Sequence, residues 1–137
     1  MVTDLEVLGQ AIKRAQYRNH RTMDAALREV GVSLVQWDAL RAIGRMPGAS
    51  GHDLAVMTFQ SDQAFGTLAN RLVDLGLVAR SAGRGRRIEH TLTDEGRHVL
   101  ANGHDIAAEV LDELFNSIGD DDQATLLRLL QKLTLSD

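Results

Sequence analysis

The sequence predicts a mainly α-helical chain that carries one small β-hairpin. Apolar residues recur with the helical period over most of the 137 residues, whereas residues 77–92 read as two short strands around a loop. The chain is 44% hydrophobic and has a single proline, which argues against disorder. Its length suits one domain with a sizeable core, so we expect one unit over residues 1–137.

The first two predicted helices are marked by apolar stripes and caps. Residues 4–30 place Leu5, Leu8, Ile12, Ala15, Met23, Ala26, Leu27 and Val30 near one face. Ser33 and Gln36 have the spacing of a capping box, which starts a second helix. The buried stripe of that helix is predicted to contain Val35, Leu40 and Ile43.

A short helix, a brief turn and a longer helix come next. Ser50 begins the short helix, residues 58–61 interrupt it, and the longer helix covers residues 62–75 until Gly76 stops it. An apolar stripe is predicted to pack against the preceding helices and consists of Phe65, Leu68, Leu72 and Leu75. With the hairpin as a wing, residues 33–96 are predicted to form a winged helix-turn-helix.

The hairpin concentrates positive charge. Four arginines lie close together, with no acidic residue between positions 80 and 87: Arg80, Arg84, Arg86 and Arg87. Because the whole chain has a formal net charge of −4, this cluster favours a polyanionic partner, most commonly nucleic-acid phosphate. A solvated loop without a partner is the alternative.

The helix over residues 62–75 presents polar residues beside its apolar stripe. The predicted DNA contacts on it, or just before it, are Ser61, Gln63, Thr67, Asn70 and Arg71. Amides suit adenine edges, arginine suits guanine or the backbone, and hydroxyls suit a base or a phosphate. Each could also be merely an exposed polar residue. Asp62 is expected to be favoured by the helix dipole and to accept from a cytosine amino group, and Gly66 costs about 1 kcal/mol relative to alanine.

The C-terminal part returns to the helical period. Thr93 caps a predicted helix that runs to about residue 117, and a last helix begins at Asp120. The last helix is rich in leucine, with Leu126, Leu127, Leu129, Leu130 and Leu133. These leucines need cover, so we expect the helices over residues 4–30 and 97–135 to form a homodimer with a second copy. A monomer with folded-back terminal helices is the alternative.

Four segments resemble the MarR family of winged helix-turn-helix transcriptional regulators: residues 36–40 (QWDAL), 51–55 (GHDLA), 70–80 (NRLVDLGLVAR) and 92–96 (LTDEG). The likeness covers essentially the whole chain. It implies a homodimeric regulator, most often a repressor, on a pseudo-palindromic operator in double-stranded DNA. The recognition helices would lie in successive major grooves and the wings would reach the minor groove.

One departure from the family pattern concerns the wing. The family usually has an Asp-x-Arg pair there, and the corresponding residues in this chain are Arg84 and Arg86. The resemblance implies that Arg86 enters the minor groove, with Arg84 and Arg87 beside it. Since the bracing aspartate is missing, we expect a mobile wing tip without a brace.

The resemblance also implies a small-molecule effector between the dimerisation helices and the DNA-binding lobe. Aromatic and cationic residues that would suit a small aromatic acid are Tyr17, His20, Arg21, Trp37 and Arg41. The alternative is that Trp37 belongs to the core and that His20 and Arg21 lie on a solvated face. A zinc site is disfavoured because Asp105 and Glu109 alone share helical spacing, with His98 and His104 less suitably placed.

Several classes are excluded or disfavoured. The chain has no cysteine, which removes disulfides and thiol chemistry. No phosphate-binding glycine loop, His-Glu-x-x-His pattern or nucleophile elbow is present, so we expect neither an enzyme nor a cofactor. We also expect a cytoplasmic protein without a membrane segment. A non-sequence-specific architectural or protein-interaction winged helix remains the alternative to a sequence-specific regulator.

Overall fold

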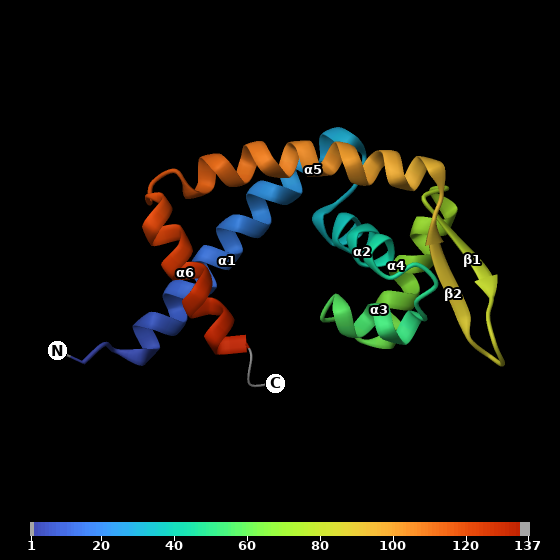
Figure 1. Cartoon of the computed structure of the whole chain (residues 1–137), viewed down its shortest axis with the longest axis horizontal. Coiled ribbons are helices and arrows are strands. Elements are labelled where there is room, and N and C mark those ends of the chain that lie inside the picture. Colours follow the sequence, from blue (N-terminus) through green and yellow to red (C-terminus); the bar gives the residue numbers. More distant parts are fainter. Residues whose placement is uncertain (1, 135–137) are drawn as a thin grey trace.

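The computed structural model describes residues 2–134, in which helices predominate and two strands form one hairpin (Figure 1). The elements are α1 (Leu5–Leu27), η1 (Arg28–Val30), α2 (Leu34–Arg45), α3 (Gly51–Met57), α4 (Asp62–Asp74), β1 (Val78–Ala82), β2 (Ile88–Leu92), α5 (Asp94–Phe115) and α6 (Asp120–Thr134). The predicted fold class is confirmed. Leu135, the last residue of the predicted C-terminal helix, lies outside the described residues.

Most helix starts are set by side-chain caps. The Asp4 carboxylate accepts from the backbone N–H of Glu6 at 2.9 Å, and Ser33 and Gln36 form the predicted reciprocal capping box. Three further helices are capped by the side chains of Ser50, Ser61 and Thr93. These are local signals, which explains why the sequence alone locates the helix starts well.

The elements separate into two lobes in space (Figure 1). Helices α2, α3 and α4 gather beside the hairpin, while α5 runs from the hairpin to the distant α6, and the C-terminal part of α1 packs against α5. The largest fully buried side chains are Phe65, Leu27, Leu40, Ile43, Leu54 and Leu72. The core therefore lies where α1 and α2 meet the helix-turn-helix.

The hairpin is held at its base and at the middle of β2. Strands β1 and β2 pair antiparallel from Val78–Leu92 to Ala82–Ile88, and Ala49 forms an additional bridge to His90. At the base, the Thr93 hydroxyl donates to the Gly76 carbonyl at 2.6 Å. A Cβ atom on Gly96 would overlap the Leu77 carbonyl, so this glycine permits the start of α5 to approach β1 closely.

Two predicted core positions are wrong. Val35 is 41% exposed, because its neighbour Leu34 packs against the core in the first turn of α2. Leu75 is 39% exposed at the C-cap of α4. Beyond it, Gly76 adopts a φ of 77° and turns the chain, so that Leu77 becomes buried in its place.

The apolar faces of the terminal helices are largely uncovered within one chain. Met23 and Leu27 in the second half of α1 are buried, whereas Leu5, Leu8 and Ile12 are exposed. Every leucine predicted on α6 is also exposed, from 39% for Leu126 to 64% for Leu133. Over residues 2–134, no helix has the length and apolar character needed to cross a bilayer.

Candidate nucleic-acid interface

Helix α4 has one buried and one polar side. Phe65, Ala69 and Leu72 are buried against the rest of the lobe. The exposed residues Gln63, Thr67, Asn70 and Arg71 lie at positions i, i+4, i+7 and i+8, which places them along one side of the helix. Helix α4 therefore presents a continuous polar face, as the sequence predicts.

Several of these side chains already have partners in the protein. The Ser61 hydroxyl accepts from the backbone N–H of Ala64 at 3.1 Å, and the Thr67 hydroxyl donates to the Gln63 carbonyl at 3.2 Å. The side-chain oxygen of Asn70, Oδ1, accepts a hydrogen bond from Arg80 Nη2 at 2.7 Å. The amide nitrogen of Asn70 remains the group that it can offer to a ligand.

Arg80 is a candidate site residue that the predicted contacts did not include. It belongs to the arginine cluster of the hairpin, but its role depends on reaching from β1 to Asn70 on α4. The bond therefore orients the Asn70 amide relative to the wing. The cluster of arginines was the available signal, whereas the partner lies ten residues earlier and becomes visible only in the fold.

The wing carries Arg84 and Arg86 at its tip, where both are exposed. The tip is closed by backbone hydrogen bonds from Gly83 N to the Arg87 carbonyl at 2.8 Å and from Arg87 N to the Arg84 carbonyl at 3.2 Å. Gly85 adopts a φ of 64° within this turn, a conformation that glycine tolerates.

The wing lacks the family's aspartate, but a different residue links it to the rest of the lobe. The Arg87 guanidinium donates to the Gly48 carbonyl and to the Asp53 carboxylate, both at 3.4 Å. Arg87 therefore ties the start of β2 to α3, and the same side chain that we predicted as a DNA contact has a positioning role. The pKa of Asp53 is lowered, chiefly by its hydrogen bond with Ser50 and further by the positive charge of Arg87.

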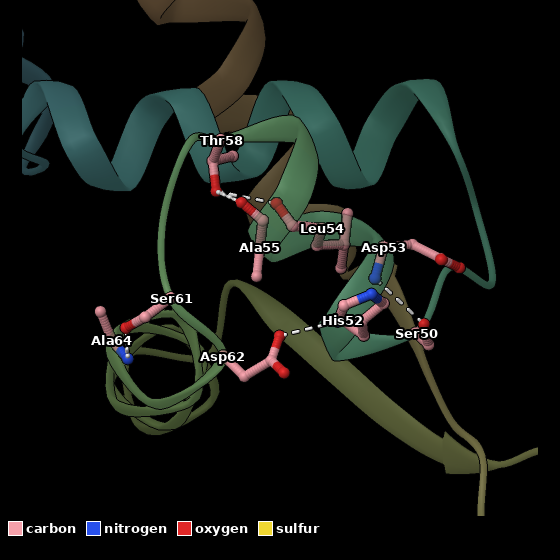
Figure 2. A network of polar contacts seen from close by, with 9 residues as sticks. All are labelled: Ser50, His52, Asp53, Leu54, Ala55, Thr58, Ser61, Asp62 and Ala64. Carbon is pink, nitrogen blue, oxygen red and sulfur yellow. Dashed lines mark hydrogen bonds and ion pairs between the residues drawn. The ribbon is translucent and has the colours of Figure 1, made fainter.

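A second cross-element pair connects α3 to the first turn of α4 (Figure 2). His52 Nδ1 lies 2.9 Å from Asp62 Oδ1, and the two side chains are 71% and 70% exposed. The hydrogen bond to Asp62, together with the negative charges of Asp62 and Asp53, raises the pKa of His52. Asp62 lies in the first turn of α4, as expected, and one of its oxygens is held by His52.

A groove separates α4 from the wing. Its lining residues are Ser50, Gly51, Asp62, Phe65, Gly66, Ala69, Asn70, Arg80, Arg86, Arg87, Ile88 and His90. The buried His90 places Nδ1 3.1 Å from the Ala49 carbonyl oxygen, which can only accept, so Nδ1 carries the proton. The groove therefore brings Asn70 of α4 together with Arg80, Arg86 and Arg87 of the hairpin. Ser61, Gln63, Thr67, Arg71 and Arg84 do not line it.

A separate cavity of about 500 Å³ lies between the lobes. Its lining residues are Gln16, Asn19, His20, Met23, Leu34, Trp37, Asp38, Arg41, His104, Ala107, Ala108 and Leu111. His20, Trp37 and Arg41 are predicted effector contacts that the structure brings together. Tyr17 and Arg21 do not line this cavity, since the Arg21 guanidinium instead lies over the Tyr17 ring at 5.7 Å from its centroid.

Arg41 dominates the chemistry of the cavity. Its guanidinium lies 4.8 Å from the centroid of the Trp37 ring and 3.5 Å from the Asp38 carboxylate. The Nε atom is buried and has no hydrogen-bond partner among the described residues. Burial raises the pKa of Asp38 despite the neighbouring arginine. The cavity is thus lined by a guanidinium that lies beside an aromatic ring.

From the sequence, His104 was considered only as a zinc ligand, but in the structure it lines this cavity. Its ring is edge-on to Trp37 with the centroids 5.1 Å apart. A Cβ on the adjacent Gly103 would lie 2.8 Å from Trp37 Cε2, so this glycine lets the indole approach α5. Within residues 2–134, no three His, Asp or Glu side chains are grouped as metal ligands.

The helix order, the capped recognition-helix candidate and the hairpin define a winged helix-turn-helix protein. A sequence model of the MarR family matches residues 30–88. The HTH-type transcriptional repressor Rv2887 of Mycobacterium tuberculosis strain H37Rv is 30% identical over 113 residues, which cover 81% of each chain. The chain therefore belongs to the MarR family and is a transcriptional regulator rather than an enzyme.

Two solved structures show the same fold. Rv2887 in complex with p-aminosalicylic acid has 28% sequence identity and a TM-score of 0.77, covering 93% of this chain and 98% of that one. The transcriptional repressor CouR, bound to a 23-mer DNA duplex, has 27% identity and a TM-score of 0.88, with 94% and 93% covered. The likeness thus extends over both lobes.

Proposed function

We propose that the protein is a cytoplasmic, homodimeric repressor that binds a pseudo-palindromic DNA operator sequence-specifically. The observation that carries this proposal is the groove in which Asn70 of α4 meets Arg80, Arg86 and Arg87 of the hairpin, while the other polar residues of α4 are exposed on the same helix. Gln63, Asn70 and Arg71 would read bases in the major groove, with Ser61 and Thr67 against the backbone. Arg84 and Arg86 would reach the minor groove, where A·T-rich sequence strengthens the negative potential.

The comparisons support the DNA partner. CouR is described as a transcriptional repressor bound to a DNA duplex, and it resembles this chain over both lobes. Rv2887 is also named a transcriptional repressor. The cationic wing of an otherwise acidic chain agrees with the same partner.

The dimer is inferred from the uncovered apolar faces. Leu5, Leu8 and Ile12 of α1 and the leucines of α6 are exposed in one chain, so a second copy would remove them from water. We assign residues 33–96 to DNA binding, and residues 4–30 and 97–135 to dimerisation. Two-fold symmetry would then place two recognition helices about 34 Å apart, one turn of DNA.

We further propose that a small aromatic acid in the cavity between the lobes releases the DNA. A carboxylate would pair with the Arg41 guanidinium, and an aromatic ring would pack beside Trp37 and His104. Rv2887 has been crystallised with p-aminosalicylic acid, a molecule of this class. Because the cavity lies where α1 and α5 meet α2, occupancy would change the spacing of the two recognition helices.

Selection of bound duplexes from a random pool tests the proposal. We expect a two-fold symmetric consensus and a preference of about 10³-fold or more over unrelated sequence. Gln63→Ala should then relax the preference at particular bases. Binding with a steep salt dependence and no consensus would instead identify the architectural or protein-interaction alternative.

A further inference from the structure

The side chains of His52 and Asp62 form an exposed pair across the turn of the helix-turn-helix (Figure 2). Neither side chain is needed to fill the core, since both are more than two-thirds exposed. Asp62 places a negative charge in the first turn of α4, beside the groove that would receive DNA. An unpaired carboxylate there would repel phosphate, so its pairing with a histidine is a feature of the binding surface.

The hydrogen bond fixes the chemistry of the ring. A carboxylate can only accept a hydrogen bond, so Nδ1 of His52 carries a proton and donates this hydrogen bond to Asp62. In the neutral ring, Nε2 then has a lone pair and cannot donate to a phosphate oxygen. In the cationic ring, Nε2 has an N–H group, which can donate while Nδ1 still holds Asp62.

We propose that His52 contacts a DNA phosphate as the imidazolium. In each operator-bound subunit the protonated ring would then bridge the Asp62 carboxylate and the DNA backbone. This inference rests on the proposed function, because it requires that α4 and the wing face DNA. It adds a contact residue that the polar face of α4 does not include. It also makes operator affinity depend on pH.

The surroundings of His52 favour the charged ring. Asp62 approaches it from α4 and Asp53 from α3, and both negative charges raise its pKa. Arg87 is the nearby cation from the wing, and it is paired with Asp53 at 3.4 Å. His90 lines the groove that Asp62 also lines, and it is buried with its Nδ1 bound to the Ala49 carbonyl.

The direction of the pH effect follows from linkage. Phosphate stabilises the imidazolium, so the pKa of His52 is higher in the complex than in the free protein. Affinity is therefore greatest below the pKa of the free protein and falls as pH rises towards the pKa of the complex. The limit is about tenfold per pH unit for each proton taken up.

The test is fluorescence anisotropy at constant salt with the duplex recovered by site selection, between about pH 6 and about pH 8.5. We expect the wild-type dissociation constant to rise at least about tenfold over this range. His52→Asn keeps a donor for Asp62 but cannot become cationic. At the acidic end of the range this variant should bind the duplex at least about fivefold more weakly than wild type, and its affinity should hardly change with pH.

Two further variants separate proton binding from bracing. Asp62→Asn removes a partner that raises the pKa of His52, so the fall in affinity should begin at lower pH. His98→Asn, which changes an exposed histidine on α5, should retain the wild-type profile. Circular dichroism melting confirms that each variant is folded.

The possible outcomes are distinguishable. If His52→Asn binds as tightly as wild type at every pH, His52 is only a brace for Asp62 and the inference is wrong. A wild-type profile that is flat in pH refutes it as well, while leaving the proposed function intact. If neither the selected duplex nor a random-sequence duplex is bound at any pH, the proposed function itself fails.

Discussion

Two glycines in different helices should respond to the same substitution with opposite changes in stability. Gly66 lies within α4, and a Cβ atom there would meet nothing within 4 Å. Gly103 lies within α5, where a Cβ would be 2.5 Å from Trp37 Cδ1 and 2.8 Å from Cε2. Helix propensity favours alanine at both positions by about 0.5–1 kcal/mol, so any difference between them reports the local packing.

For Gly66→Ala we expect the free energy of unfolding to rise by about 0.5–1 kcal/mol, because the propensity term is unopposed. For Gly103→Ala the overlap must displace an indole that is 2% exposed. Overpacking of this kind costs about 1–3 kcal/mol. Weakening the 3.3 Å bond from Trp37 Nε1 to the Leu100 carbonyl adds about 1 kcal/mol. The net loss should be about 1–3 kcal/mol.

Urea denaturation followed by circular dichroism measures both changes, with all proteins at one concentration because a dimer unfolds in a concentration-dependent way. Trp37 is the single tryptophan of the chain, so its fluorescence reports directly whether Gly103→Ala moves the ring. If the two variants change stability in the same direction and by similar amounts, the close approach of Trp37 to α5 is not as described. If Gly66→Ala is stabilised but loses duplex affinity, close approach of DNA explains why glycine occurs there.

Arg86→Ala should weaken binding to selected and unrelated duplexes alike and reduce the salt slope by about one unit; an unchanged slope in anisotropy titrations would show that the wing tip does not contact phosphate. Leu130→Glu should abolish the dimer and duplex binding together, and a variant that sedimentation shows to be dimeric would refute the interface assignment. Arg41→Ala should lose the response of the DNA complex to salicylate, whereas Tyr17→Ala should keep it, since Tyr17 lies outside the cavity. Equal responses in both variants would contradict the assigned effector site.

The sequence predicted features that depend on neighbours along the chain. The caps at Ser33, Ser50 and Thr93 depend on residues three positions away, and the structure contains all of them. Burial near helix ends was less predictable, because Leu34 rather than Val35 packs against the core where α2 begins. The helical period predicts which side of a helix is apolar. Which residues at the helix ends are buried depends on the elements that pack against that side.

The features that sequence reasoning missed depend on contacts between distant segments or on unusual backbone. Arg87 was expected to bind DNA, and its bond to Asp53 joins residues that are 34 positions apart. The turn between α3 and α4 contains Phe59 with a φ of 59° and an exposure of 97%, although no glycine marks the turn. Neither composition nor periodicity contains this information.

Local pairing of charges explains how an acidic chain can present a surface to DNA. Asp53 and Asp62 both lie near the proposed interface, but Arg87 and His52 hold them. Residues 120–122 are three consecutive aspartates at the start of α6, far from the wing in Figure 1. Exposed charges separated by more than about 10 Å are largely screened at ordinary ionic strength. The potential at the proposed interface is therefore set mainly by Arg71, the wing arginines and the two held carboxylates rather than by the net charge of −4.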